Sequence, residues 1–164
     1  MPEKVVSNTS PLISLFSINR FHLLQEFYPH IFITEAVWKE LTDTEKEGVQ
    51  FFHQEKEKGF LVINRVTPSP FLQLLHQELD EGEAEAIALA MEKKLDLLLL
   101  DEKEARSIAR IYKIPVTGTV GILMRAKREG KIPSLRKELL ALREAGFWIQ
   151  DDLFHEALHS CKEK

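Results

Sequence analysis

The sequence predicts a protein of the α/β class with a central, largely parallel sheet. The main observation is that short β-branched or leucine-rich runs alternate with longer stretches of helical period, which is typical of successive βα units. The second is size, because 164 residues with 44% hydrophobic residues suit one hydrophobic core. Breaker clusters at residues 67–70 and 130–133 are too short to be flexible linkers. We therefore expect a single domain that spans residues 1–164.

The expected strands are the short apolar runs at residues 4–7, 31–33, 61–66, 97–100, 115–117 and 147–149. Helices are expected to fill the stretches between them. Ser10 and Pro11 open the first helix, since serine caps a helix and proline fits its first turn, and Thr34 or Thr44 caps a later one. The stretch 83–94 is expected to bury one helical face, formed by Ala84, Ile87, Ala88 and Met91.

Composition limits the setting and the partners of the protein. A net charge of −4 argues against attraction of the whole surface to nucleic acid, so such contact must be local. The most apolar run, residues 95–100, contains Asp96 and is far shorter than a membrane span, and we expect no membrane segment. Polar residues interrupt the N-terminal apolar stretch, unlike a signal peptide. Cys161 is the only cysteine, so the simplest expectation is a reducing cytoplasm.

Acidic and amide side chains gather at the predicted strand ends. In doubly wound sheets, ligands bind beyond the carboxyl ends of the strands, and the polar residues placed there or nearby are Asn8, Glu40, Glu83, Glu85, Asp101 and Glu102. Crowded carboxylates are costly without a cation, and hard divalent cations such as Mg²⁺ take oxygen ligands. A bound metal lowers the pKa of water and offsets charge on phosphate. If these residues converge, the sequence predicts a metal site suited to phosphodiester hydrolysis.

Each of these residues also has a structural alternative. Asp101 follows the apolar run 97–100 and so lies at the end of a buried strand, or it caps the helix expected at residues 102–112. Glu83 and Glu85 stand in the first turn of a helix, where the macrodipole favours acids. Glu40 either flanks the core or faces solvent. These alternatives stay open on the residues alone.

Five segments resemble, in order and spacing, the successive motifs of a PIN-like subfamily. They are VVSNTSPLI (residues 5–13), AVWKEL (36–41), GEAEAIALA (82–90), LLLDEKEAR (98–106) and VTGTVGIL (116–123). The resemblance implies a three-layer α/β/α fold and Mg²⁺ or Mn²⁺ held by acidic residues. It further implies cleavage of single-stranded RNA, often by the toxin of a toxin–antitoxin pair, and commonly a homodimer.

The resemblance also carries over a set of site positions. The metal-site and catalytic positions would be Asn8, Glu40, Glu83 and Asp101, with Glu85 and Glu102 as neighbouring acids. We expect Glu83 rather than Glu85 to face the site, because residues two apart on a helix point in different directions. Asn8 replaces the aspartate typical of the nucleases. Its amide can ligate a cation without charge, or it bonds only to backbone groups of its turn. The alternative function is a weakened PIN fold that binds RNA or protein.

Substrate contacts are expected near the C-terminal half. Residues 125–143 include seven basic and two acidic residues, which is a net excess of five positive charges. Such a cluster fits a phosphate-binding rim, for which we select Arg125, Lys127 and Arg128, although charge runs are often solvated helix faces. Thr117 and Thr119 follow a predicted strand and are candidates for contact with a metal-bound water or with phosphate, and a helix-capping role for Thr119 is an equal alternative. His155 and His159, although four residues apart, make only a weak zinc motif.

Overall fold

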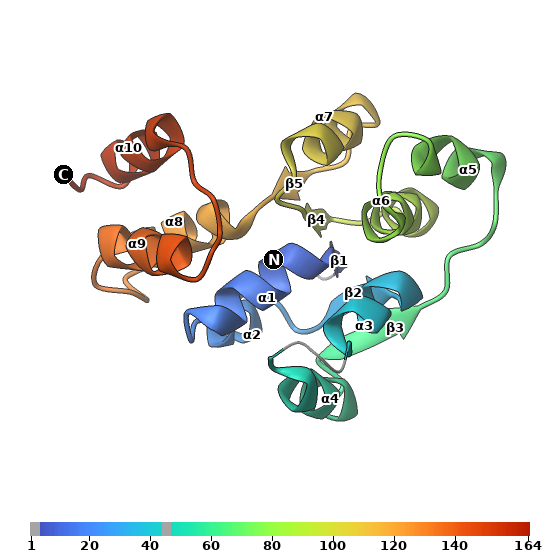
Figure 1. The fold of residues 1–164 in the computed structure, drawn as a ribbon, viewed down its shortest axis with the longest axis horizontal. Helices are drawn as coiled ribbons and strands as arrows, with labels where there is room; N and C mark the ends of the chain where they lie inside the picture. Colours follow the sequence, from blue (N-terminus) through green and yellow to red (C-terminus); the bar gives the residue numbers. More distant parts are fainter. Residues whose placement is uncertain (1–3, 44–46) are drawn as a thin grey trace.

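The computed structural model describes residues 4–43 and 47–164, and within them the chain forms a five-stranded sheet covered by helices (Figure 1). The expected cap Thr44 lies outside the described residues. The elements are β1 (Val5–Ser7), α1 (Thr9–Ser17), α2 (His22–Phe27), β2 (Ile31–Thr34), α3 (Glu35–Leu41), α4 (Val49–Glu57), β3 (Leu61–Asn64), α5 (Pro70–His76), α6 (Glu81–Lys93), β4 (Leu97–Leu99), α7 (Lys103–Ile111), β5 (Val116–Thr117), α8 (Thr119–Arg128), α9 (Leu135–Glu144) and α10 (Asp151–Ser160).

The sheet has the strand order β3-β2-β1-β4-β5, and all its pairings are parallel. The chain adds β2 and β3 on one side of β1 and then returns to place β4 and β5 on the other side. The order therefore reverses at β1, where Ser7 is paired with Leu99 and the Asn8 N–H donates to the Leu99 carbonyl at 3.0 Å. Polar residues that follow β1 and β4 consequently leave the sheet side by side, which is where such sheets bind ligands.

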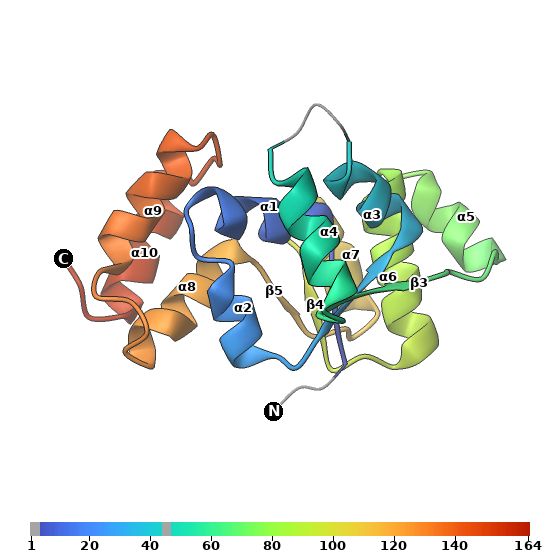
Figure 2. The same ribbon diagram turned by 90° about the horizontal axis from the view of Figure 1, so that it is seen from below.

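Both faces of the sheet are buried, as the near-continuous apolar strands require. Val5 on β1 packs into a core shared with α1, α2, α4, α8, α9 and α10, whereas Val6 faces a second core shared with α5, α6 and α7. Figures 1 and 2 show these two groups of helices on opposite sides of the strands. The α/β class and the three-layer α/β/α arrangement are thus confirmed. No helix within the described ranges has the length and apolar character needed to cross a membrane.

The structure corrects several local predictions. The run at residues 147–149 is not a strand: within the described chain it is an irregular connection between α9 and α10, anchored by Ile149, which is 1% exposed. Asn8, not Ser10, holds the N-cap position of α1. Helix α6 begins earlier than expected, at Glu81, because Asp80 caps it. Met91 does not belong to its buried face and is 42% exposed.

Candidate functional site

Helix α3 brings Glu40 to the carboxyl edge of the sheet. Thr34 ends β2, and its side chain accepts a hydrogen bond from the Val37 N–H, so the helix begins as soon as the strand ends. The helix then contacts both α1 and α6 and lies over the ends of the neighbouring strands. Half-buried Glu40 near its C-terminus therefore lies close to the start of α1, where Asn8 is, and to the start of α6.

An acidic cavity of about 320 Å³ opens at this edge. Its walls include the side chains of Asn8, Glu40, Asp80, Glu83 and Glu102. Three of the four residues predicted as metal ligands, Asn8, Glu40 and Glu83, thus line one cavity. With Asp80 and Glu102, the described lining contains four carboxylates. Among the described residues no basic side chain lines the cavity, so the negative charge is not balanced by a neighbour in this part of it.

The Asn8 amide faces this cavity with an unsatisfied oxygen. Its Oδ1 is buried and has no hydrogen-bond partner within the described residues, so this oxygen does not bond to the backbone of its turn, as one alternative had it. Gly82 leaves room in front of it: a β-carbon on Gly82 would lie 3.1 Å from Asn8 Oδ1 and 2.9 Å from Glu40 Oε1. The two oxygens therefore flank a space that exists because residue 82 has no side chain.

Glu83 lines the cavity but also holds the start of α6. The Glu83 N–H donates to Asp80 Oδ1 at 2.8 Å, and Glu83 Oε1 accepts from the Asp80 N–H at 3.3 Å, which is a capping box. Burial raises the pKa of Glu83 above its ordinary value, and the charges of Asp80, Glu102 and Glu104 raise it further, against the lowering effect of the Asp80 N–H. Glu83 can therefore both stabilise the start of α6 and contribute a carboxylate to the cavity.

Glu85 points elsewhere. Its Oε1 accepts a hydrogen bond from the Ala36 N–H at 3.4 Å, at the N-terminus of α3. Burial raises the pKa of Glu85, whereas the bonds from Ala36 and Thr34 lower it. Glu85 thus links α6 to the start of α3 and does not line the acidic cavity.

Asp101 is held in place by three hydrogen bonds. The Thr119 N–H donates to its Oδ1 at 2.7 Å, and the hydroxyl groups of Thr119 and Ser10 each donate to its Oδ2 at 2.8 Å. Helix α7 begins at Lys103 after Glu102 at the N-cap position, so Asp101 does not cap it as the alternative proposed. Instead its carboxylate accepts from the first turn of α8, where the helix dipole also favours an anion. Ser10 joins Asp101 to α1.

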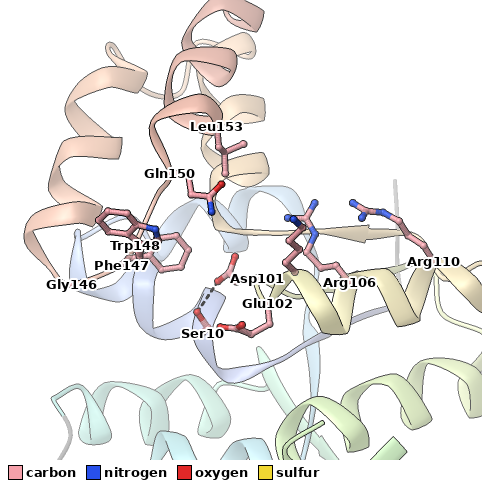
Figure 3. Close-up of a pocket in the computed structure, with 11 residues that line it drawn as sticks. Ser10, Asp101, Glu102, Arg106, Arg110, Gly146, Phe147, Trp148, Gln150 and Leu153 are labelled. Carbon is pink, nitrogen blue, oxygen red and sulfur yellow. Dashed lines mark hydrogen bonds between the residues drawn. The ribbon is translucent and has the colours of Figure 1, made fainter. Parts of the chain in front are cut away.

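A second, larger cavity of about 690 Å³ adjoins the first, because Ser10 and Glu102 line both. Asp101 lies at its base between two different walls (Figure 3). One wall is formed by Arg106 and Arg110 of α7, and the other by the connection that carries Phe147 and Trp148. The residues of these two walls were not among those selected from the sequence as site residues. The four-residue spacing of the two arginines on the helix after Asp101 was a usable signal, whereas nothing local placed Trp148 opposite them.

The predicted phosphate-binding residues are engaged within the chain. Arg125 forms an ion pair with Glu129 at 2.6 Å and its guanidinium lies 4.0 Å from the centre of the Phe27 ring. Lys127 donates to the Pro133 carbonyl at 2.8 Å, and Arg128 donates to the Ser160 hydroxyl at 2.6 Å. Neither cavity is lined by these three residues.

The two threonines differ in position. The Thr117 hydroxyl lies against Gly121 of α8, in a contact that a β-carbon at residue 121 would prevent. Thr119 is buried and does not cap α8, because Gly118 holds the N-cap position, and its hydroxyl is directed to Asp101. Of the two, Thr119 therefore acts on the site, by holding Asp101, while the fit of Thr117 against α8 gives it a packing role.

The oxygen donors at this edge fit a hydrated hard cation. Mg²⁺ usually keeps several waters and takes only one or two carboxylates from the protein. Here Glu40 can supply one carboxylate, and the unsatisfied Asn8 Oδ1 can supply a neutral amide oxygen. A fully protein-bound ion is not supported, because the described ranges contain no group of three or more acidic, histidine or cysteine side chains arranged to hold one. A cation here would rely on water and on side chains moving inward.

Comparison with known proteins identifies the family. A search of curated proteins finds no match to this chain. A model of the PIN domain matches residues 4–163. PIN domains are generally nucleases that use divalent metal ions, and the oxygen-lined cavity at the strand ends is consistent with such chemistry. Because the match covers nearly the whole described chain, this protein belongs to the PIN-domain family.

Proposed function

We propose that this chain is a ribonuclease that hydrolyses phosphodiester bonds of single-stranded RNA with the help of Mg²⁺ or Mn²⁺. The observation that carries the proposal is the buried Asn8 Oδ1, which has no hydrogen-bond partner within the described residues and faces the acidic cavity beside Glu40. A buried polar atom without a partner is costly, and a cation or its water would satisfy it. The crowded carboxylates around it require positive charge for the same reason.

The residues have distinct parts in this proposal. Asn8 and Glu40 would hold the cation directly, and Glu83 and Asp101 would bind its water or take a ligand position after a side-chain shift. When bound, a divalent cation supplies an activated water and offsets negative charge on the phosphate. Ser10 and Thr119 fix the Asp101 carboxylate, and this keeps one acceptor for a water proton at the boundary of the two cavities.

Calorimetric titration with Mn²⁺ and cleavage of labelled single-stranded RNA test the proposal. We expect the natural chain to bind Mn²⁺ and to cut RNA in Mn²⁺ but not in EDTA. Asp101→Asn should lower the cleavage rate at least about 100-fold while the chain still folds, because the amide cannot accept the water proton and carries no charge to hold the hydrated cation. Equal rates for the natural chain and Asp101→Asn would show that the site is assigned to the wrong residues.

A second candidate is a PIN fold that binds RNA or a protein without cutting. Two observations favour it: Asn8 supplies no negative charge, and the described residues hold no preassembled metal cluster. The variant Asn8→Asp separates the candidates, because a carboxylate should tighten Mn²⁺ binding. If the natural chain neither binds Mn²⁺ nor cuts RNA and Asn8→Asp gains both, the binding module is the natural function.

The toxin role, an antitoxin partner and a homodimer complete the proposal, and they rest on the resemblance of the motifs. Expression of the chain without a partner should then slow growth, and Asp101→Asn should relieve the effect. Light scattering on the purified chain gives the oligomeric state, for which we expect a dimer.

A further inference from the structure

We propose that the cavity between α7 and residues 147–150 binds the nucleotides that flank the cleaved bond. Trp148 would stack on a base, and Arg106 and Arg110 would bind backbone phosphates. The identity of the strand as RNA rests on the proposed function, whereas the binding site itself is argued from the two walls of this cavity.

The cavity has the shape and the location for a strand. With a volume of about 690 Å³ it can hold part of a flexible chain, and Asp101 lies at its base (Figure 3). It shares Ser10 and Glu102 with the acidic cavity. A strand lying in the larger cavity would therefore pass directly over the boundary where hydrolysis is proposed.

The guanidinium of Arg106 lies near the charge of Asp101 but keeps one buried N–H donor unused within the described residues. Its Nε is buried and has no hydrogen-bond partner within the described part of the chain. The nearby Asp101 uses both carboxylate oxygens to accept bonds from Thr119 and Ser10. A buried donor without an acceptor is unfavourable, and a phosphate oxygen is the acceptor that a guanidinium recognises best.

The charges of the two cavities are complementary. Within the described ranges, the larger cavity is lined by three basic residues, Lys103, Arg106 and Arg110, and by the acidic Asp101 and Glu102. The charged side chains of the described residues that line the smaller cavity are all acidic. Arg110 is exposed and lies one helical turn beyond Arg106, so the two arginines can reach successive phosphates. In a chain of net charge −4, this local reversal of sign is where a polyanion would bind.

Trp148 is held on the opposite wall with its ring in solvent. It is 80% exposed, although an indole ring gains from burial. The next residue, Ile149, is buried, and its carbonyl accepts a bond from Arg143 at 2.7 Å, so the backbone beside Trp148 is fixed. A fixed, exposed aromatic ring opposite two arginines is the usual arrangement for binding single-stranded nucleic acid, because bases stack on the ring while cations bind the backbone.

Binding is best measured without metal, so that cleavage does not interfere. The probe is a fluorescein-labelled single-stranded RNA of about ten nucleotides, within the range of a single groove. Its anisotropy is recorded with the full chain in EDTA. We expect Trp148→Ala to weaken binding by about 5- to 150-fold, and Trp148→Phe to restore most of the affinity, because the phenyl ring still stacks.

Arg110→Ala should weaken binding several-fold and reduce the salt dependence by about 0.7 in the slope of log K against log salt, the loss of one phosphate contact. Matched controls are Leu140→Ala, which removes another exposed apolar side chain, and Arg65→Ala, which removes an exposed arginine that lines neither cavity. Both controls should bind RNA as the natural chain does. Circular dichroism confirms that each variant is folded.

Two results would overturn this inference. One is RNA binding that is unchanged in both Trp148→Ala and Arg110→Ala. If Trp148→Ala instead abolishes contact with a co-expressed protein, the surface is a protein interface. The other is RNA binding lost in Arg128→Ala but kept in Arg110→Ala, which would move the strand to the basic cluster of α8. Failure of the nuclease proposal would give a different result: the natural chain would not cut RNA in Mn²⁺ but would still bind it in EDTA.

Discussion

Gly82 shows how a single residue can keep the proposed metal site open. A β-carbon at residue 82 would lie 2.9 Å from Glu40 Oε1, closer than such contacts allow, so Gly82→Ala must displace the carboxylate. The helix should not suffer, because alanine is favoured over glycine by up to about 1 kcal/mol within a helix. We therefore predict at least tenfold weaker Mn²⁺ binding with an unfolding free energy that is unchanged or slightly higher.

Calorimetry and thermal unfolding measure the two quantities separately. The control is Glu81→Gln, which removes an exposed charge at the same end of α6 without touching the cavity. It should bind Mn²⁺ nearly as the natural chain does. Natural affinity in Gly82→Ala would mean that the space between Asn8 and Glu40 does not hold the cation.

Some site residues could be predicted from the sequence because topology alone fixes their position. Asn8 and Asp101 each follow a buried strand, and adjacent parallel strands place them at one edge. The sequence did not predict Arg106 and Trp148, which are 42 positions apart and face each other only because the segment after α9, residues 145–147, lies beside α1. A side-chain pair created by tertiary packing leaves no periodic signal in the sequence.

At the scale of elements, the carboxyl end of the chain holds α9 in place. The Leu135 N–H donates to Glu163 Oε2 at 2.6 Å and the Arg136 N–H donates to Oε1 at 3.2 Å, at the N-terminus of the helix. Lys127 of α8 forms an ion pair with the same carboxylate at 3.3 Å. Burial of Glu163 acts to raise its pKa, but the two N–H bonds and Lys127 outweigh it, and the pKa lies below its ordinary value.

We predict that Glu163→Gln lowers the unfolding free energy by about 1 kcal/mol near neutral pH, as for the loss of a helix cap. Because the folded-state pKa is depressed, this contribution is present above the unfolded-state pKa and is lost as the pH falls through the folded-state value. Urea unfolding at several pH values should show the variant and the natural chain converging in acid. Glu156→Gln, an exposed acid of α10, is the control; an equal loss in both would contradict the cap.

The strands of the sheet were predicted from the sequence, whereas residues 147–149 were wrongly predicted to be one of them. Five of the six apolar runs are strands, each within about two residues of the expected ends, because a strand buried on both faces must be apolar throughout. Residues 147–149 carry the same pattern for another reason. There Ile149 anchors a connection in the core while Trp148 faces solvent, and within the described chain no neighbouring strand pairs with them.

At the scale of the whole molecule, unbalanced acidic charge should link stability to metal. Burial and neighbouring acids raise the pKa of Glu83 in the folded chain, so its contribution to stability is present at acid pH and is lost as the pH rises through that raised value. A bound cation removes this penalty, because it favours the ionised carboxylates. The metal-free chain should therefore lose stability from this group between acid and neutral pH, and Mn²⁺ should restore it.

We predict that Mn²⁺ at 100 times its dissociation constant raises the unfolding free energy by about 2.7 kcal/mol, which for a chain of this length is a rise in Tm of about 5–11 °C. The rise should be larger at about pH 7.5 than at about pH 5, because the pKa of Glu83 is raised and protons compete with the cation for its carboxylate. Calorimetric scans in EDTA and in Mn²⁺ at both pH values measure it. In Glu83→Gln the difference between the two pH values should shrink, whereas in Glu81→Gln it should persist. An identical Tm in EDTA and in Mn²⁺ at both pH values would contradict a cation site at this edge, because a ligand that binds only the folded chain must stabilise it.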